Sequence, residues 1–415
     1  MLKAGTLFYS IVISLVIALL SGSMIMLSQL SAESFQRSLS RQELELNAAS
    51  GLNLLLSSQT LVAEEEERTI DLYKNGTDSV LLSRQFWGAF EIAASKAMRH
   101  GQESMSIAET GYSPNSADNY CLYVSDLDKP VAICGATALR GTAFLPKAGI
   151  KRAYIEGQNY TGSAMVYGEI RESAKELPPF NKKLTERIKT LARQEATAAL
   201  PEETETTRTT NSFLSPVVVI SERPAMTIRA SYSGHIVLIS QTAITVEAAA
   251  SLEDVILCAP KIIIKQGFRG NLQAFAADSM LIEKDVVLNY PSVLGIVQQE
   301  GAKKNAALIL SQGDSISGSL FLCNAASSQA LYTGGITIPE KAVICGSVYS
   351  NGYADMRGNI SGSLMCRNLL LHTSSSVYEN HLLNAVIDRS ALSPYYAGIS
   401  LVEETGFKKA VKWLK

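Results

Sequence analysis

The residues that most often carry chemistry are scattered through this sequence without a recognisable catalytic pattern. In the C-terminal half, the carboxylates Asp278, Asp285, Asp314 and Asp355 stand apart from one another. Glycoside hydrolysis needs two carboxylates that are close in space, a requirement that the sequence neither meets nor excludes. Nucleophile-elbow, phosphate-loop, zinc-protease and EF-hand motifs are absent. We therefore expect no catalytic residue and no enzymatic activity.

Candidate metal ligands do not form a pattern either. His235 and His372 stand beside aliphatic runs typical of strands, where a hydrogen-bonded structural imidazole is the expected role. Glu283 and Asp285 have a spacing that metal ligands use, but no third oxygen donor is near them in the sequence. We interpret both as solvent-facing positions of a strand, and we expect neither a metal nor another cofactor.

The chain has six cysteines, none of them in a CxxC pair. Those in or beside apolar, strand-like runs are predicted to be buried thiols that pack as small hydrophobic groups: Cys258, Cys323, Cys345 and Cys366. Cys121 and Cys134 differ, because they flank LYVSDLDKPVAI, which is typical of two short strands around a turn. A disulfide across this hairpin is expected if the compartment is oxidising.

The N-terminus carries the clearest structural signal. No residue between positions 4 and 32 is charged, and residues 6–27 are long enough as a helix to cross the hydrocarbon core of a membrane. Ser21 and Ser23 are small, as at a signal-peptide cleavage site, but the apolar run continues beyond them. This favours a retained anchor, followed by a helical stalk over residues 28–63.

The charges beside this helix are nearly balanced. Lys3 precedes it, and Arg37 and Arg41 follow it together with glutamates. A tail as short as residues 1–5 is easily left in the cytoplasm, and long C-terminal domains translocate largely regardless of charge. We therefore predict a single-pass protein of the bacterial inner membrane with its large domain outside the cytoplasm.

The same N-terminus carries a resemblance to a known family. The chain begins MLKAG, a short leader with a lysine and a glycine, and continues with the hydrophobic helix; NAASGLNLLLS at residues 47–57 is rich in small residues. In these features it resembles type IV minor pilins and type II secretion pseudopilins. The resemblance implies processing between Gly5 and Thr6 and protein partners in a pilus-like or secretion assembly. Ser10 departs from the family, since most pilins carry Glu there; the alternative is a plain anchor with a stalk.

The C-terminal half consists of short β-type runs separated by Gly, Asn or Ser. A glycine followed by a small polar or histidine residue and then an aliphatic one recurs in YSGHI at 232, FRGNL at 268, ISGSL at 316, ICGSV at 344 and ISGSL at 360. This pattern predicts a parallel β-helix over residues 212–396, with its first coils at 141–174. The alternative fold is a β-sandwich. In the style of its sequence, this half resembles bactofilins and other bacterial surface β-helix domains.

The remaining segments divide by composition. Residues 79–140 are expected to form a small α/β or β domain in which Trp87 and Phe90 are core residues. Residues 175–211 predict a short helix and a linker inserted between one coil and the next, with Leu184, Ile188 and Leu191 on one helical face. Residues 397–415 are expected to form a lysine-rich amphipathic helix. It would cap the open end of the coils, or bind a partner or a lipid surface.

The charge balance narrows the classes of partner. With 37 basic and 39 acidic residues the net charge is −2, which gives no electrostatic case for nucleic acid. We expect membrane lipid and protein partners of an envelope assembly, and hence a structural or interaction protein. Two alternatives remain: a carbohydrate-binding or carbohydrate-cleaving surface domain that recognises a polysaccharide, and a cytoplasm-facing, bactofilin-like scaffold.

Overall fold

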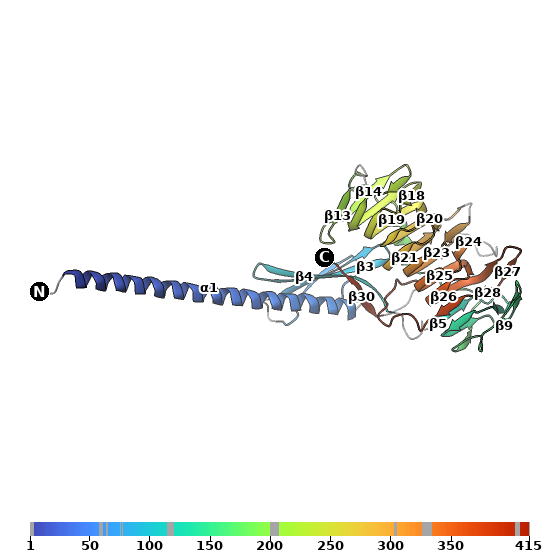
Figure 1. Cartoon of the computed structure of the whole chain (residues 1–415), viewed down its shortest axis with the longest axis horizontal. Coiled ribbons are helices and arrows are strands. Elements are labelled where there is room, and N and C mark those ends of the chain that lie inside the picture. Colours follow the sequence, from blue (N-terminus) through green and yellow to red (C-terminus); the bar gives the residue numbers. More distant parts are fainter. Residues whose placement is uncertain are drawn as a thin grey trace. The chain divides into compact units, whose positions relative to one another are not determined.

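The structure is a computed structural model that describes residues 4–57, 61–63, 65–74, 76, 78–113, 120–199, 207–302, 305–325, 334–402 and 407–414. Figure 1 shows its helices and strands. The chain forms two compact units. Unit 1 contains Met1–Gln85 and Ala93–Ile107, and unit 2 contains Phe86–Ile92 and Ala108–Lys415.

Unit 1 contains a long helix and part of an antiparallel sheet. Its elements are α1 (Ala4–Ser57), β1 (Glu67–Ile70), most of β2 (Ser79–Trp87), the second part of β3 (Phe90–Arg99) and the first part of β4 (Gln102–Tyr112). On α1, the side chains of Leu44, Ala48, Leu52 and Leu55 are buried. Their spacing places them on one face of the helix, so the second half of α1 has an apolar face that packs in the core of unit 1.

Gly51 lies on this buried face and permits a close approach. A Cβ atom at this position would lie 2.3 Å from Ser95 Oγ and 2.7 Å from Val80 Cγ1. The glycine therefore does not weaken the packing of the helix. It allows the helix backbone to rest directly on side chains of β2 and β3.

The helix ends earlier than the stalk predicted over residues 28–63. It stops at Ser57, and residues 61–63 are not helical. The buried guanidinium of Arg84 donates hydrogen bonds to the carbonyl oxygens of Leu55 and Val62. Arg84 thereby satisfies a carbonyl oxygen of the last helical turn, a group that has no partner within the helix.

Unit 2 is built on a large parallel sheet. Its strands are β5 (Tyr120–Val124), β7 (Ala138–Arg140), β8 (Thr142–Leu145), β12 (Ile170–Glu172), β13 (Arg208–Asn211), β14 (Val218–Glu222), β15 (Met226–Ile228), β16 (Ser231–Gly234), β17 (Ile236–Ser240), β18 (Ala243–Val246), β19 (Ser251–Ile264), β20 (Arg269–Ile282), β21 (Val287–Val297), β22 (Ala306–Ile309), β23 (Ser315–Cys323), β24 (Gly334–Ile338), β25 (Val343–Met356), β26 (Asn359–His372), β27 (Val377–Glu379) and β29 (Val386–Asp388). Within the described residues, β27 joins by antiparallel pairing and the other strands join in parallel, and the sheet is barrel-like. Smaller sheets contain β6 (Val131–Cys134), β9 (Ile150–Arg152) and β28 (His381–Leu383), and the pair β10 (Tyr154–Ile155) and β11 (Gln158–Asn159).

In successive strands of the parallel sheet, residues of the same type are in register with one another. Ile316 of β23 is in register with Ile344 of β25, which is in register with Ile360 of β26, and all three are buried. Stacked aliphatic side chains of this kind fill a single continuous core. A β-sandwich is built from antiparallel pairs, whereas the strands from β13 to β26 pair in parallel.

The recurring glycines occupy a shared position in this register. Gly318, Gly346 and Gly362 are direct partners on β23, β25 and β26, with φ angles of +149°, +149° and +151°. A Cβ at Gly346 would lie 1.8 Å from the carbonyl oxygen of Gly318. Only glycine fits where successive strands turn this tightly against each other.

The tip of the β2–β3 hairpin belongs to unit 2. The Gln273 side chain accepts a hydrogen bond from the Ala89 N–H at 2.8 Å and donates one to the Trp87 carbonyl at 3.0 Å. The Trp87 ring lies 4.8 Å from the imidazole of His235 and 5.4 Å from the ring of Phe213, measured between centroids. Trp87 and Phe90 are both 3% exposed, which confirms their predicted place in a core.

The first coils were expected at residues 141–174, followed directly by a helical insertion. Instead, β8 and β12 lie beyond β26, because β5 pairs with β26 and with β8, and β8 with β12. The next strand along the chain, β13, pairs with β16 at the opposite end of the sheet. The segment between them is therefore a connection from one end to the other rather than an insertion between neighbouring coils. The boundary expected at residue 140 likewise falls inside unit 2.

We call residues 173–199 the crossing segment. Its first residue, Ser173, donates a backbone hydrogen bond to Leu145 of β8, and Thr197 near its end donates one to Val219 of β14. Between these ends, Phe180 packs on Phe321 of β23, with ring centroids 4.9 Å apart. The crossing segment thus covers a row of outward-facing side chains that are in register across the sheet: Ile239, Cys258, Phe275, Gly295, Phe321, Tyr349 and Met365.

The short helix predicted in this segment is present as α2 (Lys182–Leu191). Asn181 caps its N-terminus by accepting a hydrogen bond from the Leu184 N–H at 3.3 Å. Leu184 and Ile188 are buried, as their spacing on one face predicted, and Leu191 is partly buried.

The predicted hairpin between Cys121 and Cys134 was wrong, whereas a disulfide between these two cysteines stays a prediction. β5 and β6, which carry these cysteines, pair in parallel with other strands, β5 with β26 and β8, and β6 with β28 and β9. Both thiols are free and buried. A turn between two short apolar runs suggested a local hairpin, but each run instead finds a partner far away in the sequence.

The predicted C-terminal helix was also wrong. Lys408–Trp413 form a strand, β30, that pairs antiparallel with the Ala108–Tyr112 part of β4. The buried Lys408 ammonium forms an ion pair with Glu91 of β3. The lysine spacing suits a helix, but the backbone of β4 offers hydrogen-bond partners that a helix would leave unused.

Partly buried hydrophobic side chains also pack against the core of the parallel sheet: Ile150, Tyr160, Met165, Val166, Ala198 and Val218.

Candidate functional site

The first half of α1 is the most conspicuous surface of unit 1. Residues 5–39 are all exposed, although residues 6–27 are almost wholly apolar. By length and composition α1 is long and apolar enough to cross a membrane. Beyond this stretch, ion pairs between residues four apart, Glu33 with Arg37 and Arg41 with Glu45, follow on the helix surface. The helix therefore changes from a lipid-compatible to a water-compatible surface along its length.

Gly5 and Thr6, the candidate processing site, both lie in the first turns of α1. Both are exposed, and a Cβ at Gly5 would meet no other atom within 4 Å. The bond between them is accessible, and its cleavage stays a prediction.

Two of the carboxylates named in the sequence analysis lie near each other, because the charge of Asp285 adds to the rise in the pKa of Asp314 that burial causes. Asp314 accepts hydrogen bonds from the backbone N–H groups of Ser311 and Val286, at 2.7 and 3.1 Å, and therefore holds a turn. Burial raises the pKa of this carboxyl to about 6. Glu283 forms an ion pair with Lys265 at 2.8 Å, as a strand surface position would.

One histidine does have a carboxylate partner. Nδ1 of His372 lies 2.9 Å from Oδ2 of Asp355, whose pKa is raised by burial. His235 instead lies against Trp87, and burial lowers its pKa. Among the residues that the structure describes, no three His, Cys, Asp or Glu side chains come together as a metal site.

Cys121 and Cys258 are not nucleophiles at neutral pH. Burial raises the pKa of the Cys121 and Cys258 thiols to about 12. The nucleophilic form is the thiolate, so thiols with such pKa values are almost fully protonated and unreactive.

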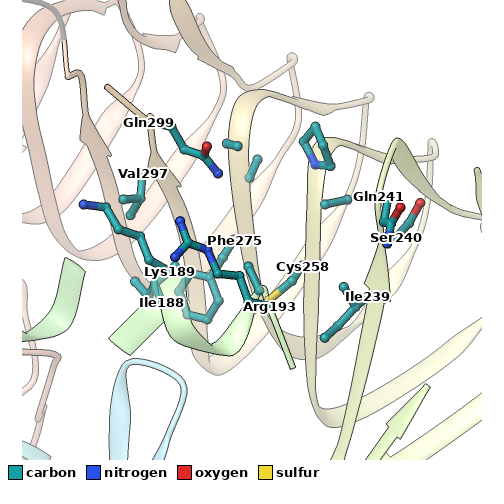
Figure 2. Close-up of a pocket in the computed structure, with 15 residues that line it drawn as sticks. Ile188, Lys189, Arg193, Ile239, Ser240, Gln241, Cys258, Phe275, Val297 and Gln299 are labelled. Carbon is teal, nitrogen blue, oxygen red and sulfur yellow. The ribbon is translucent and has the colours of Figure 1, made fainter. Parts of the chain in front are cut away.

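A groove in unit 2, which we call the helix groove, was not indicated by the sequence (Figure 2). It lies between the end of α2 and the outer face of β17, β19, β20 and β21, and its volume is about 240 Å³. Ile188, Lys189, Ala192 and Arg193 come from the crossing segment; the sheet and its following turns supply Ile239, Ser240, Gln241, Cys258, Ala259, Pro260, Phe275, Ala276, Ala277, Val297 and Gln299. No sequence signal could have found it, because α2 meets strands that lie far from it in the chain.

The floor and the rim of the helix groove differ in chemistry. The floor is apolar and buried, and three of its side chains, Ile239, Cys258 and Phe275, are register partners on adjacent strands. The rim is polar (Figure 2): Lys189, in the last turn of α2, is partly exposed, whereas Arg193, just after α2, and Gln241, just after β17, are exposed. An apolar floor with a polar, cationic rim suits a small amphipathic ligand.

The helix and the sheet define the class of this chain: one candidate membrane span at the N-terminus, followed by a mainly β domain. No protein-family model matches the chain, and no curated protein does. Among solved structures it matches the competence-associated pilin ComZ from Thermus thermophilus at 10% identity, over 85% of this chain and 86% of that one, with a TM-score of 0.21. At that TM-score, the match carries no argument about the fold.

Proposed function

We propose that this protein is a non-enzymatic structural component of the bacterial envelope. In this proposal α1 anchors it in the inner membrane, the β domain lies outside the cytoplasm, and the chain is a minor component of a pilus-like or secretion assembly.

The observation that carries the proposal is the division of α1 into two surfaces. Residues 5–39 are exposed on all sides, whereas Leu44, Ala48, Leu52 and Leu55 pack in the core of unit 1. An apolar helix of this length is unstable in water unless lipid or other apolar helices cover it. A helix held at one end by a folded domain and free at the other suits both insertion into a membrane and packing among helices of neighbouring subunits.

The mature N-terminus tests the pilin part of the proposal. Intact-mass analysis of the protein purified from its native membrane should find a chain that begins at Thr6. In a Gly5→Leu variant, the same analysis should find the leader retained. A native protein that still carries Lys3 would refute processing and leave the plain anchor.

The side of the membrane requires a separate experiment, because the native cysteines are buried or only partly exposed. Ser374 is exposed, so a Ser374→Cys variant provides an accessible thiol in the β domain. A membrane-impermeant maleimide should label it in intact spheroplasts as fully as in disrupted cells. Labelling only after disruption would place the domain in the cytoplasm and support a scaffold there.

We further propose that the barrel-like sheet is a β-helix. Along its length, β19 pairs first with β16, then with β17 and then with β18, as expected if three consecutive strands form one coil below it. Two cysteine pairs test this stacking at the start and end of a coil: Ser231→Cys with Ser251→Cys, and Ala243→Cys with Lys261→Cys. Both should form disulfides on mild oxidation, and the mismatched pair Ser231→Cys with Lys261→Cys should not. Failure of either matched pair would contradict the coil.

A further inference from the structure

The helix groove has the features of a binding site with a defined charge preference. Lys189 and Arg193 are the charged residues of its lining, and no Asp or Glu of the described residues lines it. Lys189 forms an ion pair with Glu186 at 3.0 Å, and the Glu186 side chain is 71% exposed. Arg193 is exposed, and its guanidinium has no hydrogen bond or ion pair within the described part of the chain. Among the described residues, the planar guanidinium of Arg193 therefore has no partner at the rim, above an apolar floor.

The amide side chains of the rim are also available. Gln241 and Gln299 are exposed, and neither side chain has a hydrogen-bond partner among the described residues. Ser240 differs, because its hydroxyl already donates to the Pro224 carbonyl and accepts from the N–H groups of Thr242 and Ala243. The polar groups that can bind a ligand are therefore one guanidinium, one ammonium and two amides, which surround buried apolar side chains.

We propose that the helix groove binds the carboxylated sugar of an acidic polysaccharide. A hexuronate has an apolar ring face for the floor, hydroxyl groups for Gln241 and Gln299, and a carboxylate that Arg193 can hold with two parallel hydrogen bonds. The volume of about 240 Å³ is below the roughly 300–1,000 Å³ of sites for drug-sized ligands, so it suits one sugar ring rather than a larger molecule.

Two other anionic partners fit the geometry less well. An acidic peptide gains much of its affinity by pairing its backbone with an open strand edge. At the floor, however, β17, β19, β20 and β21 are all paired on both sides. A phosphate group carries more charge than a carboxylate and favours helix N-termini. The groove lies at the C-terminal end of α2, where the negative end of the helix dipole disfavours anions, and a doubly charged phosphate more than a singly charged carboxylate.

The test is a titration of the full-length protein in detergent with defined oligosaccharides. Isothermal titration calorimetry at low salt should detect binding of tri-galacturonate and none of the neutral tri-galactose. An Arg193→Gln variant should bind tri-galacturonate about 10- to 100-fold more weakly, the usual worth of a hydrogen bond to a charged group. The matched control, Arg269→Gln, removes an exposed arginine of β20 outside the groove and should bind like the native protein.

Further titrations identify the partner and guard against misfolding. Lys189→Gln is a second variant and should also weaken binding, with an unchanged circular dichroism spectrum. Equal binding of the neutral trisaccharide, tighter binding of hexaglutamate or inorganic phosphate, or unchanged affinity in both groove variants would overturn the proposal. These measurements do not depend on α1 or on processing at Gly5, so their failure would leave the proposed anchoring role intact.

Discussion

Replacing Gly346 by alanine should destabilise unit 2 severely. The added methyl group would lie 1.8 Å from the carbonyl oxygen of Gly318 and 2.8 Å from the Tyr396 hydroxyl oxygen. The first contact is with backbone that is itself paired in the sheet, so it can be relieved only by moving β25 away from β23. The φ angle of +149° adds a second penalty, since side-chain-bearing residues rarely adopt it.

The two effects can be given magnitudes. Overpacking a well-packed site costs about 1–3 kcal/mol, and holding a non-glycine residue in a glycine-only conformation costs about 1–3 kcal/mol. We expect Gly346→Ala to lose about 2–6 kcal/mol of unfolding free energy. Gly267 is the matched control, because its φ is +79° and a Cβ there would meet nothing within 4 Å. Gly267→Ala should cost only about 1–2 kcal/mol for the left-handed backbone.

Urea unfolding followed by tryptophan fluorescence measures the difference. The two tryptophans of the chain, Trp87 and Trp413, both belong to unit 2, so fluorescence reports this unit without a contribution from unit 1. The midpoint should fall much further for Gly346→Ala than for Gly267→Ala. If the two variants unfold at the same urea concentration, the stacked glycines do not constrain the sheet and the register described here is incorrect.

Three other perturbations have defined outcomes. Leu52→Ala should destabilise unit 1 by about 2–5 kcal/mol, seen as faster hydrogen exchange in β2 and β3, whereas Leu54→Ala, at a 38% exposed position, should change exchange little. Burial lowers the pKa of His235 below its ordinary 6.5, so the unfolded state binds the proton at a higher pH than the folded state does. Unit 2 should therefore lose stability as the pH falls below about 6.5. A His235→Gln variant should show a weaker dependence of the melting temperature on pH. Lys408→Met leaves the carboxylate of Glu91 buried without its partner and should lower the free energy of unfolding by about 3–5 kcal/mol. Hydrogen exchange should then show less protection along β30. The doubly neutral Lys408→Met, Glu91→Gln protein should recover much of the lost stability.

The sequence predicted those features that depend on neighbouring residues. The uncharged run of residues 6–27 and the leucines after it specify a continuous helix by local periodicity alone. The face of α2 with Leu184 and Ile188 follows from the same periodicity. The glycine pattern was also informative, because Gly318, Gly346 and Gly362 mark equivalent positions in successive strands.

Features that depend on partners far away in the chain could not be predicted from the sequence. The run around Lys408–Trp413 has a helical pattern, and its pairing with β4 overrides that pattern. Cys121 and Cys134 flank two strands that look adjacent, yet each pairs elsewhere. The helix groove could not be predicted for the same reason: its cations come from α2, while its floor comes from strands that follow much later in the chain.

The crossing segment also has a consequence for how the protein is made. Leu122 of β5 is the register partner of Leu364 of β26, so β5 emerges from the ribosome roughly 240 residues before the strand that it needs, a delay of roughly 10–50 s at ordinary synthesis rates. During that interval β5, β8 and β12 lack the neighbour that shields them, and unpaired strand edges readily recruit other chains. We therefore expect the nascent protein to be most prone to aggregation between the synthesis of β5 and the emergence of β26. Truncation before β26 should make the chain aggregate more readily than the full-length protein.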